Sequence, residues 1–132
     1  MRAQIRVTRD GDAFVVRFAP SQAAAIGGAL ETLRSRDLGD EALALRVGAG
    51  RAEVEELIGR LRELRAASGD LRLRPHELHV IHAALTAVAT AFLVQGRHFS
   101  EEPFHHALGV FREDVDALAG HLAQAVSDAA GR

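Results

Sequence analysis

The 132-residue sequence contains no cysteine, lysine, tyrosine or tryptophan, and only three prolines. The absence of cysteine excludes disulfides and thiol chemistry and fits a reducing cytoplasm. Without tyrosine or tryptophan, the common aromatic platforms for sugars and nucleic-acid bases are missing. All sixteen basic residues are arginine. Together with the heavy use of alanine, glycine and leucine, this bias suggests a GC-rich bacterial genome rather than a function.

The sequence also lacks the charge and the motifs that identify many functions. The formal net charge is −2 at pH 7, so no global positive field favours nucleic acid or an anionic membrane. The alternating N-terminus has no apolar run long enough for a secretory signal, and the sequence has no Gly-rich phosphate loop or nucleophile elbow. We therefore expect a cytoplasmic, non-enzymatic protein without a cofactor.

What the sequence does contain is an internal repeat within a single domain, 1–132. Copy one covers about 13–67 and copy two about 70–129. Val16–Pro20 aligns with Leu71–Pro75. Farther along, Gly48 and Arg51 align with Gly109 and Arg112 after a longer loop in copy two.

Hydrophobic periodicity predicts one strand and three helices in each copy. Residues 2–9 and 13–18 alternate around Asp10-Gly11, which favours a hairpin, and 71–74 predicts a third strand. Helices are expected at about 20–35, 40–46 and 75–95, at 101–108, and around Val54–Leu64 and Val115–Val126. Residues 41–47 alone could be a strand, but their alignment with Pro103–Leu108 favours helix. The predicted fold is α+β, a small antiparallel sheet packed with about six helices in two pseudo-symmetric strand-helix-helix-helix repeats.

The helix expected at 75–95 carries no charged residue after Glu77. Its core stripe is flanked by small or weakly polar residues, namely His79, Ala83, Thr86, Ala87, Thr90 and Ala91. A helix that is apolar all round is buried on all sides, either within its own fold or against a partner. Both alternatives stay open here, and the flanking residues are our candidate interface for a homodimer or a protein partner. The stretch is marginal in length for a membrane span, and it contains His79 and His82.

Histidines cluster in copy two and define a second hypothesis, a metal- or pH-responsive module. The candidate metal ligands are His76, His79, His98, Glu102 and His105. Glu102 and His105 have the Glu-x-x-His spacing of carboxylate-bridged metal sites, which need two such motifs. Copy one offers no second motif, so weakly polar surface residues are the simpler interpretation.

A third hypothesis is a nucleic-acid-binding regulator. Arg6, Arg17, Arg72 and Arg74 could share the outer face of the sheet, but no aromatic residue among them can stack on a base. The segments 101–108 and 111–129 superficially resemble a helix-turn-helix, yet the second begins Phe111-Arg112-Glu113-Asp114, where acids repel phosphate. We therefore expect an interaction or regulatory protein, with its specialised surface in copy two.

Overall fold

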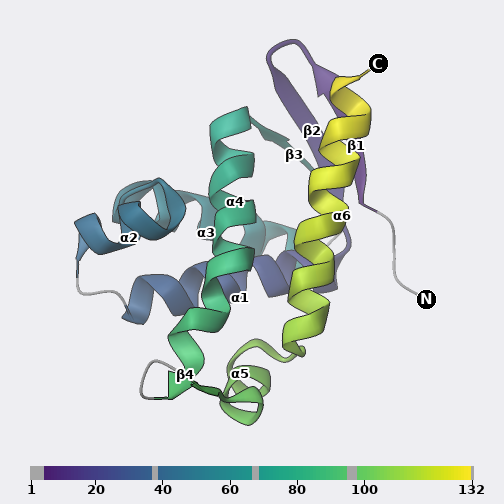
Figure 1. Ribbon diagram of the computed structural model, residues 1–132. Helices are drawn as coiled ribbons and strands as arrows, with labels where there is room; N and C mark the ends of the chain where they lie inside the picture. The colour runs from purple at the N-terminus through teal and green to yellow at the C-terminus, as the bar shows by residue number, and fades with distance from the viewer. Residues whose placement is uncertain (1–4, 37–38, 67–68, 95–97, 132) are drawn as a thin grey trace.

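The computed structural model describes residues 5–36, 39–66, 69–94 and 98–131, which adopt an α+β fold (Figure 1). The main sheet contains β1 (Arg6–Asp10), β2 (Ala13–Phe18) and β3 (Gly69–Leu73). The helices are α1 (Pro20–Arg36), α2 (Asp40–Val47), α3 (Arg51–Ala66), α4 (Pro75–Ala87), α5 (Glu101–Leu108) and α6 (Arg112–Ala130). Between α4 and α5 lie the 3-10 helix η1 (Val88–Phe92) and the short strands β4 (Leu93–Val94) and β5 (His98–Phe99). The predicted α+β class is confirmed.

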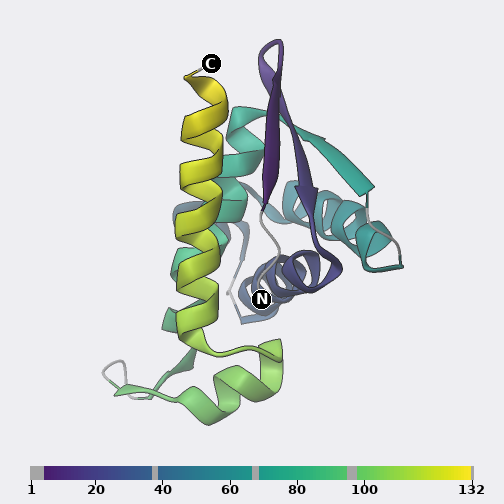
Figure 2. The ribbon, with the colours of Figure 1, turned by 90° about the vertical axis from the view of Figure 1, so that its right-hand side faces the viewer.

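The sheet is antiparallel in the order β1-β2-β3, with a tight turn at Gly11, whose φ is 65°. Phe14 lies opposite Leu73 and Val16 opposite Leu71, and all four side chains are buried on the inner face. Helix α6 runs alongside β1 (Figure 2). The sheet and α6 therefore enclose one side of the core.

Helix α1 is enclosed by several other elements. It packs against α3, α4, η1, α5 and β2. Small residues on α1 permit this crowding, and a Cβ added at Gly28 would lie 3.1 Å from Leu108 of α5. Helix α4 packs against α6, α1, α2, η1 and β3, yet it keeps an exposed face.

The helix predicted at 75–95 is wrong at its C-terminal end. The α-helix ends at Ala87, continues as η1 to Phe92, and becomes extended at Leu93. The Thr90 hydroxyl donates to the carbonyl of Ala87 at 2.6 Å. Such side-chain bonds compete with helical backbone bonds and weaken the α-helix here.

The structure confirms a helix at 40–46, so the strand alternative for 41–47 is wrong. Helices α2 and α5 end alike, because Gly48 and Gly109 take left-handed φ angles of 81° and 74° and cap the last turn. In each case the first N–H of the next helix, at Arg51 or Arg112, donates to a carboxylate 3.2 Å away. These local features match, while a pseudo-twofold relation between the two halves stays a prediction.

Candidate functional site

One face of α4 and η1 is only partly covered by the rest of the described chain. It consists of the six predicted interface residues, of which His79, Thr86 and Thr90 are exposed and Ala83, Ala87 and Ala91 are half-buried. We call these six residues the α4 face. Helix α2 flanks it on one side and α6 on the other (Figure 1). The face carries no Asp, Glu or Arg.

A groove of about 380 Å³ lies between α4 and α6, next to the α4 face. Phe14, Leu78 and Leu122, all buried, contribute apolar surface to it, and the imidazoles of His79 and His82 line it on the α4 side. None of the described residues that line this α4–α6 groove is Asp, Glu or Arg. Its chemistry therefore suits an apolar side chain with a hydrogen-bonding neighbour.

Helix α2 holds the other edge of the α4 face. The His79 ring lies 3.4 Å from the position that a Cβ would take at Gly48. The Arg46 guanidinium donates to the Thr90 hydroxyl at 2.7 Å. The C-terminal end of α2 thus positions two residues of the face, and its left-handed glycine leaves room for the His79 ring.

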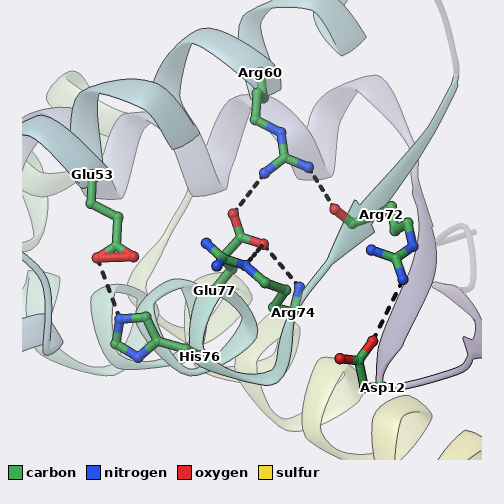
Figure 3. Close-up of polar contacts among 7 residues, drawn as sticks. All are labelled: Asp12, Glu53, Arg60, Arg72, Arg74, His76 and Glu77. Atoms are coloured by element: carbon green, nitrogen blue, oxygen red, sulfur yellow. Dashed lines mark hydrogen bonds and ion pairs between the residues drawn. The ribbon is translucent and has the colours of Figure 1, made fainter.

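Glu77, at the start of α4, is the one charged side chain that is buried among the described residues, with 6% exposure. Arg60 on α3 donates to its carboxylate at 2.7 Å and also to the Arg72 carbonyl at 2.6 Å (Figure 3). The Arg74 backbone N–H donates to the same carboxylate at 2.9 Å. Glu77 therefore joins α3, β3 and α4 and fixes the start of the helix that carries the α4 face.

This network was not predicted from the sequence, although part of its signal is local. Glu77 is the third residue of a helix that begins with Pro75, which is where a carboxylate can accept the N–H of the preceding cap residue. Gln22 does the same in α1, accepting the Ala19 N–H at 2.8 Å. The partnership with Arg60 has no such local signal, because it depends on how α3 packs.

Burial is the largest influence on the pKa of Glu77, and it acts to raise it. The Arg74 N–H bond and the charges of Arg60 and Arg74 outweigh burial, so the pKa is lowered overall. A carboxylate with a lowered folded-state pKa stabilises the fold above its ordinary pKa, and this contribution is lost as pH falls through the folded-state value.

We expect the free energy of unfolding to fall with acidification more steeply in the wild type than in Glu77→Gln. The amide does not titrate, so it removes the Glu77 contribution to the slope. Urea unfolding between about pH 6 and about pH 3 measures the two slopes. Equal slopes would show that Glu77 does not contribute to the acid sensitivity.

The candidate metal ligands are dispersed. His76 pairs with Glu53 at 3.3 Å (Figure 3), His79 lines the α4–α6 groove, and the His105 ring stacks on Phe111 at 4.3 Å. Glu102 is exposed on α5, and the side chain of His98 lies outside the described residues. Where side chains are described, no group of three or more His, Asp and Glu could hold a metal ion.

The arginines on the outer face of the sheet are mostly neutralised by neighbouring acids. The ion pairs are Arg17–Asp70 at 2.8 Å, Arg72–Asp10 at 3.0 Å and Arg72–Asp12 at 3.6 Å, and Arg74, just beyond β3, pairs with Glu77 at 3.3 Å. Arg6 lies opposite Arg17 in the sheet. A face with so many paired charges offers little net attraction to phosphate groups.

The start of α6 is equally unsuited to a DNA groove. The Arg112 guanidinium lies over the Phe99 ring at 4.8 Å and pairs with Asp116 at 3.7 Å. The Arg112 N–H is held by Glu101. The recurring Gly-x-x-Arg segment thus has a structural role at the turn between helices.

Comparison with known proteins assigns no function to these surfaces. Within the described ranges, no helix is both long and apolar enough to cross a bilayer. No protein-family model, no curated protein and no solved structure matches the chain.

Proposed function

We propose that this chain is a non-enzymatic interaction protein that binds a protein partner, or a second copy of itself, through the α4 face. The observation that carries the proposal is that this uncharged face remains exposed. Elsewhere the chain places charge on such positions, and α3 exposes Glu55, Glu56, Arg62 and Glu63. A solvent-facing helix surface without charge is typical of a surface that another molecule covers.

Helix α1 has a face of small residues that can be compared with the α4 face. In the repeat that we propose, Gly28 of copy one corresponds to Ala83 of copy two. Leu108 of α5 lies against Gly28, and Gly28 and Ala83 are both half-buried. Farther along, Thr86 of copy two is exposed, whereas the matching Glu31 of copy one is half-buried. Matching glycine caps and matching N–H bonds at the starts of α1 and α4 support the repeat. Copy two therefore carries the face that its own fold covers only in part.

We propose that the protein acts in a bacterial cytoplasm. The absence of cysteine and the exclusive use of arginine among the basic residues support it. The dispersed histidines and the paired arginines support neither the metal-responsive nor the nucleic-acid alternative. An interaction role needs none of these groups.

A photo-crosslinking residue at Thr86, in the middle of the α4 face, is expected to form a discrete adduct in cells. The control places the same residue at Thr8, an exposed strand position on β1. Adduct formation at Thr86 but not at Thr8 supports the proposal. The absence of a discrete adduct at Thr86, or an identical adduct pattern at Thr8, contradicts it.

A negative charge inserted by Ala83→Glu is expected to weaken the same association about tenfold or more, because an unpaired carboxylate would be buried in the interface. Ala52→Glu, at an exposed position of α3, is the matched control. The yield of the Thr86 adduct measures the effect, and thermal unfolding checks that the variant is folded. Unchanged adduct yield with Ala83→Glu would place the interface elsewhere.

A further inference from the structure

Phe111 is an exposed aromatic residue with no apolar cover of its own. It caps the start of α6 with 47% of its surface exposed, and one side of its ring stacks on His105. It lines a concavity of about 420 Å³ together with Glu101, Glu113, Asp116 and Arg112. An exposed aromatic ring beside several carboxylates is thus presented at one end of α6.

A strip of small residues connects this concavity with the α4–α6 groove. Asp116, Gly120, Ala123 and Ser127 follow one another at intervals of four, three and four along α6, which places them on one face. Asp116 belongs to the Phe111 concavity, whereas Ala123 and Ser127 line the groove. A Cβ at Gly120 would meet nothing, so the middle of the strip is open to a neighbouring chain.

Phe111 cannot reach the groove of its own molecule. Along the helix, Phe111 is about 17 Å from Leu122, the nearest α6 residue of the groove, at 1.5 Å per residue. A twofold axis across α6 near Gly120 reverses the helix direction in a second copy. Residues equally far from Gly120 on either side, such as Glu113 and Ser127, then face each other.

We propose that a second copy of this chain occupies the α4–α6 groove, inserting its Phe111 in an antiparallel dimer about a twofold axis near Gly120. The contact is isologous, so each copy donates one Phe111 and receives one. This inference rests on the proposed function, in which the α4 face is an interface, and it specifies the partner. The strip of small residues lets the two α6 helices approach closely.

The polar groups of the two surfaces are complementary. The groove offers the imidazoles of His79 and His82 and contains no carboxylate among its described lining residues. The Phe111 concavity contributes the carboxylate of Glu113, together with those of Glu101 and Asp116, which already accept from or pair with Arg112. Imidazole N–H groups donate and carboxylates accept, so the antiparallel arrangement pairs donors with acceptors. A parallel arrangement would bring the carboxylates of both copies together, which costs free energy.

Disulfide trapping tests the register directly, because the natural sequence has no cysteine. We mix a Glu113→Cys chain with a Ser127→Cys chain that carries a mass tag, and oxidise the mixture. The proposal predicts that the mixed disulfide dominates over both symmetric disulfides, while Thr8→Cys stays monomeric. Predominant symmetric disulfides, or as much dimer with Thr8→Cys, overturn it.

Sedimentation velocity tests the role of the aromatic side chain. Phe111→Ala is expected to raise the dissociation constant of the dimer about tenfold or more. Leu45→Ala, which removes another exposed apolar side chain, is expected to leave it unchanged. Equal effects of the two substitutions, or a wild-type protein that is monomeric at about 100 µM, overturn the dimer. If the wild type is monomeric but Thr86 crosslinks to a different protein, the proposed function stands and only the second-copy inference fails.

Discussion

Arg60→Leu is expected to lower the free energy of unfolding by about 3 kcal/mol, the lower end of the range for removing one partner from a buried ion pair. The substitution leaves the Glu77 carboxylate buried, with only the Arg74 groups to compensate its charge. It also removes the bond to the Arg72 carbonyl at 2.6 Å. The Arg60 side chain is 28% exposed, which favours the lower end of the range. Urea unfolding at neutral pH measures the effect.

Glu77→Gln provides the matched control and is expected to cost less than Arg60→Leu. The amide oxygen can still accept the Arg74 N–H, as Gln22 accepts the N–H of Ala19 in α1. Glu77→Gln also leaves no uncompensated negative charge at this position. The double variant Arg60→Leu/Glu77→Gln is expected to lose less unfolding free energy than the sum of the two single losses, because the two residues are in direct contact. Additive costs would show that the ion pair is not what stabilises this junction.

Much of the fold could be predicted from the sequence because its signals are local. The alternation around Asp10-Gly11 defines the hairpin, and proline followed by an apolar stripe defines the starts of α1 and α4. The break after Ala87 could not be found in this way. It depends on hydroxyl bonds within the helix and on how Phe92 packs against Phe104.

The lack of charge along 75–95 left open whether the fold itself or a partner covers that helix, because charge content is an indirect measure of burial. Helix α1 contains Glu31 and Arg34, yet it is enclosed, since both residues lie at its edge and pair with Arg62 and Glu55 of α3. Helix α4 lacks charge over most of its length, yet one face is exposed. The six residues of that face were nevertheless predictable, because helical periodicity alone separates them from the core stripe.

The α4–α6 groove could not be predicted from the sequence, for a different reason. Its walls come from residues that are far apart in the sequence, with Phe14 on β2, His82 on α4 and Ser127 on α6. No spacing rule connects them. Phe111 was visible in the sequence, but only the packing of α5 against α6 shows that the ring is exposed beside Asp116 and Glu113.

Phe104→Ala is expected to have the largest effect of any substitution considered, about 4 kcal/mol of lost unfolding free energy. The side chain is fully buried, and its ring meets those of Phe92 and Phe99 edge-on, each with centroids 5.2 Å apart. Truncation removes both ring pairs and leaves a cavity between α5 and η1. Urea unfolding followed by circular dichroism measures the loss.

Leu43→Ala tests whether the matching position in copy one has the same role. Leu43 is 1% exposed on α2 and aligns with Phe104, but it is smaller, so its truncation is expected to cost about 3 kcal/mol. Phe104→Leu places in copy two the leucine that copy one has at the matching position. It is expected to lose less than half as much unfolding free energy as Phe104→Ala. If the two copies are one unit, α2 and α5 each depend on a single large anchor at this position. A Leu43→Ala cost below about 1 kcal/mol would contradict that equivalence, since a fully buried leucine then contributes no more than a surface residue.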